Sequence, residues 1–211
     1  MKPWSTRVAY ATIQVPLICL SFLLFGCAND IEVSQGYAGG ASSSTSTSDC
    51  SATSRKRVFV TSTTSNGNLG GISGGDTKCA TLASAAGLCG TWKAWLSDAT
   101  TTAISRIADV GPWYHVDRAT LVFSSKAQIA AGTDPSDTIY KTETGANSAA
   151  AQVWTGSTNA GQIDVGDHCQ SWASSNGGDT GQVGLTGDAT RWSDFAPNGC
   201  GALRPIYCFE Q

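Results

Sequence analysis

The chain has 211 residues, 8 of them cysteine, and a formal net charge of −3 at pH 7. Lys2 and Arg7 belong to a predicted signal peptide, so its removal reduces the 13 basic residues to 11, against 16 acidic ones. A protein that binds nucleic acid or heparin normally has a basic face. The only basic cluster is Arg-Lys-Arg at residues 55–57, so the composition argues against both classes.

Residues 1–26 are typical of an export signal. Two positive charges precede an apolar run at residues 15–25 (VPLICLSFLLF), which is too short to span a bilayer as a stable helix. The run ends in Leu24-Phe25-Gly26-Cys27, similar to the looser lipobox of spirochaetes. This pattern predicts a lipoprotein that is lipid-modified on Cys27. The alternative is an ordinary secretory cleavage beside an unmodified cysteine.

Cysteine parity agrees with lipidation. Cys19 leaves with the signal peptide and Cys27 takes the lipid, which leaves an even set: Cys50, Cys79, Cys89, Cys169, Cys200 and Cys208. Such a set can close fully into disulfides in an oxidising compartment, although six cysteines allow 15 pairings. None of them forms a C-x-x-C pair, which argues against a zinc site.

The mature chain divides by composition into a tether and a domain. Residues 27–54 are predicted to be the lipidated N-terminus and a flexible tether, because the run GYAGGASSSTSTS at 36–48 has too few apolar side chains to form a core. Tryptophans and alternating apolar runs follow. Residues 55–211 are therefore predicted to form one domain.

The first part of the domain predicts a strand, a loop and a helix. Residues 57–62 (RVFVTS) alternate and predict the strand. The glycine-rich residues 66–75 predict the loop, after which Asp76 is the predicted helix N-cap. Gly87 is predicted to end the helix, with Leu88 as the apolar contact that follows. Residues at helical spacing predict its apolar face: Cys79, Leu82, Ala83 and Ala86.

The rest of the domain predicts short strands between long loops. Residues 91–97 (TWKAWLS) alternate and predict a strand with Trp92, Ala94 and Leu96 on one face. Shorter runs lie at 113–116, 152–155 and 205–209. The domain's six tryptophans are predicted mainly as core anchors, with exposure of Trp95 and Trp113 as the alternative. Few helices, short strands and long loops indicate an α+β domain.

Several sequence blocks together resemble the endostatin domain of collagens, in order and spacing, from about residue 57 to the C-terminus. They are GGDTKC at 74–79, AAGL at 85–88, GTWKAWLS at 90–97, VWTGS at 153–157 with Gly161, CQSW at 169–172, Gly181-Gln182, Cys200 and IYCFE at 206–210. With a lipobox in front, the chain is most similar to the leptospiral endostatin-like surface lipoproteins and to related bacterial domains of unknown function.

The resemblance implies a C-type-lectin-like fold with two nested disulfides, Cys79–Cys208 and Cys169–Cys200. Cys50 and Cys89 have no counterpart in endostatin and are left to pair with each other. The zinc histidines and heparin-binding arginines of endostatin have no clear match in this sequence.

The resemblance also implies an adhesin-type binding module at the cell surface, anchored in the outer membrane. Its implied host ligands are laminin, fibronectin, plasminogen or fibrinogen, and complement factor H. The long loops between Thr155 and Cys200 are the predicted binding region, because binding residues are commonly carried on loops held by a rigid scaffold. Which loop binds is not predicted.

Catalytic and metal-binding patterns are weak. Residues 71–75 (GISGG) match G-x-S-x-G, which marks a nucleophile elbow only where a strand leads in and a helix leaves. A triad also needs a histidine, and the chain has only His115 and His168. His168 beside Asp167, and His115 near Asp117, are candidate metal-ligand pairs, but an exposed or hydrogen-bonded histidine is commoner. We predict no enzyme, no metal and no cofactor.

Calcium-dependent glycan binding is the alternative function. Trp192-Ser193-Asp194 ahead of Cys200 is similar to the Trp-Asn-Asp run of sugar-binding C-type lectins, but no matching Glu-Pro-Asn type loop is present. Calcium takes six to eight oxygen ligands. Further carboxylates lie in the same region without spacing that indicates convergence: Asp164, Asp167, Asp179 and Asp188. A third possibility is a structural envelope lipoprotein without a host ligand.

Overall fold

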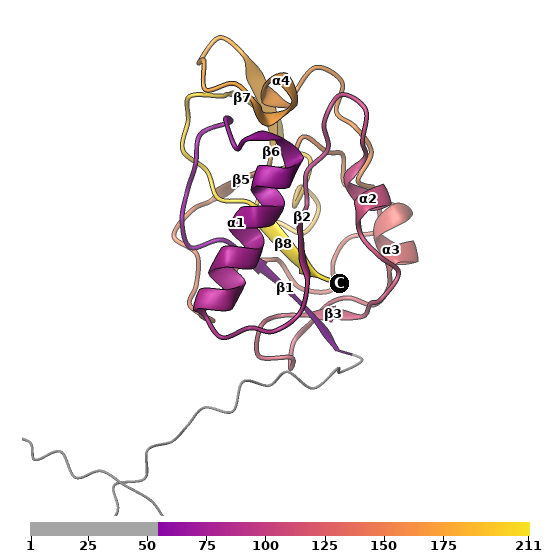
Figure 1. The fold of residues 1–211 in the computed structure, drawn as a ribbon. Coiled ribbons are helices and arrows are strands. Elements are labelled where there is room, and N and C mark those ends of the chain that lie inside the picture. Colours follow the sequence, from indigo (N-terminus) through magenta and orange to yellow (C-terminus); the bar gives the residue numbers. More distant parts are fainter. Residues whose placement is uncertain (1–54) are drawn as a thin grey trace, which may run out of the picture. The chain divides into compact units, whose positions relative to one another are not determined.

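The computed structural model describes residues 55–211, so the predicted signal peptide, Cys27, the tether and Cys50 lie outside the described residues. Within this part the first and last strands pair with each other: β1 (Lys56–Val60) runs antiparallel to β8 (Tyr207–Glu210), with Val58 opposite Phe209. Both strands belong to a five-stranded sheet in the order β2-β8-β1-β3-β4 (Figure 1).

The other strands of this sheet are short, and a second small sheet lies beside it. They are β2 (Trp92–Ala94), β3 (Trp113–Tyr114) and β4 (Leu121–Phe123). The second sheet has the order β5-β6-β7 and contains β5 (Gln152–Trp154), β6 (Thr180–Leu185) and β7 (Ala196–Gly199). The two sheets meet where Trp154 N–H donates to the Pro205 carbonyl at 3.0 Å.

Four helices complete the fold of residues 55–211: α1 (Gly71–Ala85), α2 (Ala103–Arg106), α3 (Lys126–Ala130) and α4 (Cys169–Trp172). α1 lies against β2 and β8 (Figure 1). A Cβ on Gly75 would lie 2.7 Å from the Leu96 side chain, so glycine permits this close approach. The domain is therefore α+β, with short strands and long connections.

The start of α1 differs from the prediction, whereas its end agrees. The helix begins at Gly71, so the predicted loop 66–75 supplies its first turn and Asp76 is not its N-cap. The Asp76 carboxylate instead accepts from Ala94 N–H at 2.9 Å and from the Arg106 guanidinium at 2.5 Å. At the other end Gly87 has φ 72°, and Leu88 N–H donates to the Ala83 carbonyl at 2.8 Å, as expected of a Schellman motif.

The core lies on both faces of the larger sheet. Val58 and Val60 of β1 join one buried cluster, and Phe59 between them joins the other. Of the strand predicted over 91–97, β2 covers Trp92–Ala94, and Trp95 N–H still donates to the Tyr207 carbonyl of β8 at 2.9 Å. Both Trp95 and Leu96 are fully buried. All six tryptophans of the described residues are at most 3% exposed, so the alternative of exposed Trp95 and Trp113 is wrong.

Two disulfides join distant parts of the domain. Cys79–Cys208 links α1 to β8, and Cys169–Cys200 links α4 to the residue after β7. These are the two pairs that the resemblance implies. Cys89 is also disulfide-bonded, and its predicted partner Cys50 lies outside the described residues. Within residues 55–211, no helix combines the length and apolar character needed to cross a membrane.

Candidate binding surface

The loops that follow β5 and β6 form a surface that we call the loop face, defined as residues 155–168 and 186–195. Buried hydroxyl groups attach it to the core. Trp95 Nε1–H donates to Ser193 Oγ at 2.8 Å, and Thr155 Oγ1 donates to the Ser193 carbonyl at 2.7 Å. Ser157 Oγ lies 2.8 Å from Ser97 Oγ. Each such bond contributes about 1 kcal/mol, so the two loops are held in a defined position.

The short helix α4 lies directly after the first loop and is left-handed. Its four residues have φ between 50° and 62° although none is glycine. Left-handed backbone costs about 1–2 kcal/mol for each such residue. The Cys169–Cys200 disulfide offsets this cost, as do the bond from Ser171 N–H to His168 Nδ1 at 2.9 Å and the bond from Trp172 Nε1–H to the Ser97 carbonyl at 2.7 Å. The residues CQSW have no glycine or asparagine that would predict this conformation.

Three aspartates of the loop face are near enough for their charges to interact: Asp164, Asp167 and Asp194. Burial raises the pKa of the Asp164 carboxyl, and the like charges of Asp194 and Asp167 raise it further. All three side chains are half-buried. We call this group the acidic cluster. Their spacing in the sequence does not predict this proximity, because α4 and β6 separate Asp167 from Asp194 in the chain.

Gln182 of β6 connects this cluster to the sheet. Its backbone N–H donates to the Asp167 carbonyl at 2.8 Å, and its side-chain Nε2 donates to Asp194 Oδ1 at 2.5 Å. Gln182 is only 3% exposed, and its Oε1 has no hydrogen-bond partner among the described residues. The amide therefore contacts Asp194 through its nitrogen, while its oxygen is buried without a hydrogen-bond partner among the described residues.

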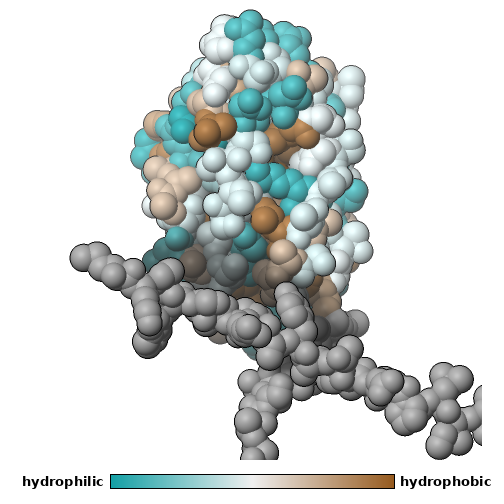
Figure 2. Space-filling view, turned by 60° about the vertical axis from the view of Figure 1, so that its left-hand side comes forward, coloured by the Kyte–Doolittle hydropathy of each residue, from teal (hydrophilic) through white to brown (hydrophobic). Residues whose placement is uncertain are grey.

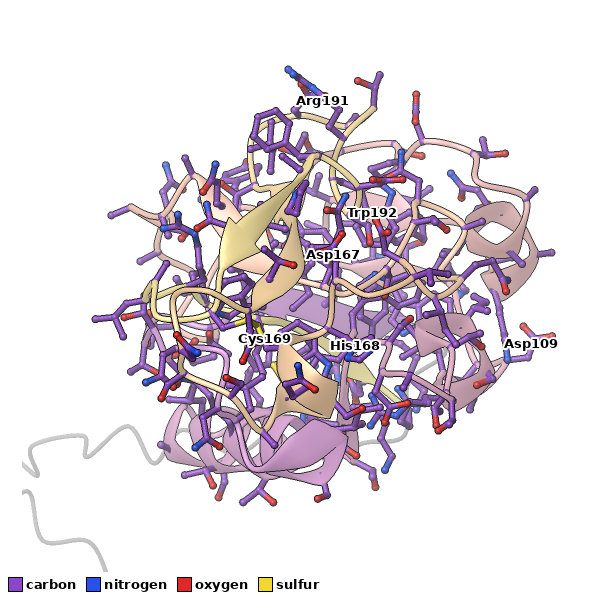
Figure 3. The ribbon with its side chains drawn as sticks, turned by 90° about the horizontal axis from the view of Figure 1, so that it is seen from above. Asp109, Asp167, His168, Cys169, Arg191 and Trp192 are labelled. Atoms are coloured by element: carbon purple, nitrogen blue, oxygen red, sulfur yellow. A yellow bond between two sulfur atoms is a disulfide. The ribbon has the colours of Figure 1, made fainter. Side chains whose placement is uncertain are left out.

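Exposed apolar side chains flank the cluster. Val165 is 87% exposed and Phe195 is 38% exposed, and the only other large apolar side chain exposed within residues 55–211 is Leu203. The Arg191 guanidinium lies over the Phe195 ring, 5.2 Å from its centroid, and pairs with Asp188 at 2.5 Å. Figure 3 shows Arg191 at the upper margin of the molecule and Asp167 nearer the middle of the view. The face drawn in Figure 2 has only small, separate apolar patches among polar side chains.

The remaining carboxylates named in the calcium hypothesis have other partners. Asp179 accepts from Ser174 Oγ at 2.5 Å. The carboxylate of Asp188 accepts from Arg191 and from Thr190 N–H. Of the five aspartates considered from the sequence, the structure therefore brings together three.

Neither histidine belongs to a metal-binding group. His115 is buried, and its Nε2 lies 3.2 Å from an oxygen of Asp137, not from Asp117. His168 Nδ1 accepts from Ser171 N–H. Across residues 55–211, no group of three or more His, Cys, Asp or Glu side chains is positioned to hold a metal ion.

The G-x-S-x-G match has no nucleophile-elbow geometry. Ser73 lies in the first turn of α1, exposed, with its hydroxyl directed to the Gly70 carbonyl at 3.5 Å. No strand leads into this turn, because residues 61–70 contain only isolated bridges. The glycines of this motif belong to the helix that carries Cys79.

Two surface hollows lie outside the acidic cluster. One of about 460 Å³ lies between residues 148–151 and 185–191, and the other, of about 440 Å³, is lined mainly by threonine, serine and alanine. The only ionisable side chains in their linings are Asp188 and Arg191, which pair with each other. Neither hollow therefore presents an uncompensated charge to a ligand.

Together the described residues define a disulfide-linked α+β domain with a firmly held loop face. A family model described as "Protein of unknown function (DUF1554)" matches residues 62–189. The match covers more than half of the chain, so the protein belongs to this family. The matched segment contains α1, β5, β6 and the first part of the loop face. The search of curated proteins found no match.

Proposed function

We propose that the protein is a surface lipoprotein of the leptospiral endostatin-like type whose loop face binds host matrix and plasma proteins. One observation carries this proposal: Val165 and Phe195 are exposed on loops that buried hydroxyl groups and a disulfide hold in place. Aromatic side chains commonly dominate the energy of protein interfaces, and binding residues commonly lie on loops of a rigid scaffold. The identity of the ligands rests on the resemblance alone.

The same proposal includes a C-type-lectin-like fold and an acyl anchor at Cys27. Antiparallel pairing of the first and last described strands supports the fold, as do the two disulfides at the positions that the resemblance implies. The anchor is supported by the lipobox-like sequence that ends at Cys27. A lipid and a tether would hold the binding domain away from the membrane at the cell surface.

A solid-phase assay tests this function. The oxidised full chain is titrated onto immobilised laminin, fibronectin, plasminogen, fibrinogen and factor H, with the reduced chain as the unfolded control. We expect saturable binding to at least one ligand. Phe195→Ala should weaken that binding at least about tenfold, because truncating an aromatic anchor of an interface costs about 2 kcal/mol or more.

Leu203→Ser is the matched control, since Leu203 is 62% exposed but lies outside the loop face. Absence of binding to every ligand would refute the proposal. An equal loss in Leu203→Ser and Phe195→Ala would remove the loop face from it.

The acidic cluster favours calcium-dependent glycan binding as a second candidate. Its three carboxylates are oxygen ligands of the kind that calcium takes, although the described residues provide no group with metal-binding geometry. A glycan array probed with and without a chelator tests this candidate. Glycan binding that the chelator abolishes would support it, and chelator-independent binding or none would exclude it.

A further inference from the structure

We propose that the second of the two surface hollows binds an uncharged oligosaccharide without calcium. This hollow, which we call the hydroxyl hollow, has a volume of about 440 Å³ and is lined by residues outside the loop face. Most of its lining residues carry a hydroxyl group: Thr61, Ser62, Thr64, Thr142, Thr144 and Ser148. Such a site goes beyond the proposed function, because it involves neither the loop face nor a host protein.

The lining of the hydroxyl hollow is polar but uncharged. Its other members are Asn147 and three alanines, so no lining residue is ionisable. Pockets for small molecules are usually lined mainly by apolar side chains with a few polar groups, so a lining made mostly of hydroxyl residues favours a polar ligand. A hydroxyl both donates and accepts hydrogen bonds. This lining therefore suits a ligand whose own groups do both, as sugar hydroxyls do, better than it suits an ion.

A buried carboxylate fixes the hydroxyl group of Ser62. Glu143 is only 5% exposed. Ser62 N–H donates to Glu143 Oε2 at 3.0 Å, and Ser62 Oγ donates to Glu143 Oε1. Because a carboxylate only accepts hydrogen bonds, the hydroxyl hydrogen of Ser62 is committed to Glu143. The lone pairs of Ser62 Oγ are left as acceptors on an exposed residue that lines the hollow.

Two other lining side chains keep donors free. The Asn147 side-chain oxygen accepts from Lys141 Nζ at 2.7 Å, and its Nδ2 group has no partner among the described residues. Thr64 is exposed, and its hydroxyl makes no hydrogen bond within residues 55–211. The lining therefore offers an acceptor at Ser62 and donors at Asn147 and Thr64, and a ligand hydroxyl can pair with either kind.

Backbone hydrogen bonds hold the hydroxyl hollow in shape. Thr142 N–H donates to the Ala146 carbonyl at 2.8 Å and closes the turn on one side of the hollow. Val60 N–H donates to the Lys141 carbonyl at 2.9 Å and attaches this turn to β1. A preformed site reduces the entropy that binding loses through ordering of the protein, which favours binding of a ligand that makes only neutral hydrogen bonds.

The backbone beside the hollow is poorly suited to an extended peptide. A peptide that binds by adding a strand needs free N–H and C=O groups along an exposed edge. Ser148 N–H instead donates to the Tyr140 carbonyl at 2.7 Å. Ala150 N–H donates to Ser148 Oγ at 3.2 Å, and the Ala150 carbonyl accepts from Thr186 Oγ1 at 2.8 Å. The available polar contacts are therefore those of side chains.

The neighbouring hollow gives room for more than one sugar unit. The linings of the two hollows share Ser148, Ala149 and Ala150, so the hollows adjoin along this segment. Their volumes of about 460 and 440 Å³ both lie within the range of about 300–1,000 Å³ that is usual for ligand sites. An oligosaccharide therefore fits this surface better than a single sugar does.

The test is an NMR titration of the full oxidised, isotope-labelled chain with maltotriose, cellotriose and mannotriose. We expect saturable amide shifts with at least one trisaccharide, largest at residues 61–64 and 142–150. The dissociation constant should be the same with and without EDTA. It should also stay constant between about 0.05 and about 0.5 M NaCl, because salt screens charged contacts and not neutral ones. The unaltered chain locates the site, so this part of the test does not depend on any variant folding.

The double variant Thr64→Val/Asn147→Ala removes both free donors from the lining. Its matched control is Thr133→Val/Asn176→Ala, which changes an exposed threonine and an exposed asparagine outside both hollows. We expect trisaccharide binding to weaken at least about tenfold in the hollow variant and less than about twofold in the control, because each neutral hydrogen bond is worth roughly fivefold in affinity.

The proposed site is wrong if no trisaccharide gives saturable shifts, if the shifts lie in the loop face, or if the control variant loses as much affinity as the hollow variant. Binding that EDTA abolishes would favour the calcium-dependent candidate instead. The neutral peptide acetyl-Ala-Ser-Ala-Ser-Ala-amide is titrated as a rival ligand, and equal affinity for it would contradict an oligosaccharide site. If host proteins bind but no trisaccharide does, the proposed function stands and the oligosaccharide site fails. The opposite result would leave the site and remove the proposed function.

Discussion

Removing the Cys169–Cys200 disulfide tests whether the loop face depends on a covalent constraint. The change is Cys169→Ala with Cys200→Ala. The bridge closes a segment of 31 residues, for which the chain-entropy model gives a stabilisation of about 4 kcal/mol. The Cys79–Cys208 bridge closes 129 residues, for which the same model gives about 5 kcal/mol. Loop length alone therefore predicts that the outer bridge matters more for global stability.

Around the left-handed helix α4, however, we expect the Cys169–Cys200 bridge to matter more than its loop length suggests. Its four residues cost about 4–8 kcal/mol in backbone strain, and Cys169 is one of them. Without the bridge, the burial of Trp172, its hydrogen bond to the Ser97 carbonyl and the bond from Ser171 N–H to His168 Nδ1 remain to hold the turn. Burial of a tryptophan contributes about 3–5 kcal/mol and each hydrogen bond about 1 kcal/mol, a sum similar to the strain that leaves the turn with little net stabilisation. We expect the turn to relax and Trp172 to lose its fixed position.

Two measurements follow this change in the oxidised protein. The melting temperature should fall by about 8–16 °C, since about 1 kcal/mol corresponds to about 2–4 °C in a domain of this size. The indole N–H of Trp172 should lose its protection from hydrogen exchange well below the melting temperature. In Cys79→Ala with Cys208→Ala, the loss of stability should be larger while the Trp172 indole stays protected in the folded state. An inner-bridge variant that loses less than about 1 kcal/mol and keeps Trp172 protected would refute the reasoning.

Two further predictions concern charged groups. Arg57 and Glu210 form a buried ion pair, 2.7 Å apart with side chains 4% and 7% exposed, so Glu210→Gln should cost about 3–5 kcal/mol in urea unfolding because it leaves a buried cation poorly paired. Asp188→Asn breaks an ion pair whose arginine is 52% exposed, so solvent screening should make its loss of stability much smaller than that of Glu210→Gln. Equal losses in the two variants would contradict this difference between buried and exposed ion pairs. Burial and the neighbouring Asp194 and Asp167 raise the pKa of Asp164 above its ordinary 3.8. The ionised carboxylate therefore destabilises the folded state at neutral pH. This destabilisation decreases as the pH falls through the raised pKa and is lost below the unfolded-state value of 3.8. Asp164→Asn should therefore raise the melting temperature at pH 7 and leave it unchanged at pH 3, and a lower melting temperature at pH 7 would contradict the sign.

Local sequence signals determined those parts of the fold that neighbouring residues control. Gly87 followed by Leu88 predicted the end of α1, because a left-handed glycine and the bond that closes the helix involve only adjacent residues. The alternation at residues 57–62 predicted β1 to within two residues at its C-terminal end. The general expectation that tryptophans anchor the core also agrees with their burial.

Tertiary contacts determined the local structure wherever the sequence signals were compatible with more than one conformation. Asp76 suits an N-cap, but inside α1 it binds Arg106 and the backbone of β2, which no local pattern contains. Residues 71–75 suit a loop, yet helix α1 includes them, and Gly75 lets the helix pack closely on Leu96. The strand predicted over 91–97 is shorter in the structure, although Trp95 packs in one buried cluster and Leu96 in the other as strand alternation predicts.

The candidate site shows most clearly which features the sequence determines and which depend on tertiary contacts. The sequence by itself determined that acidic residues are frequent between Thr155 and Cys200 and that cysteines lie at the positions of an endostatin-like pairing. Only the folded chain decided that Asp164, Asp167 and Asp194 approach one another while Asp179 and Asp188 have partners of their own. The physical reason is that the positions of the two loops depend on buried hydroxyl contacts such as Thr155–Ser193 and on the Cys169–Cys200 disulfide. These contacts join residues far apart in the chain, so they leave no periodic pattern in the sequence.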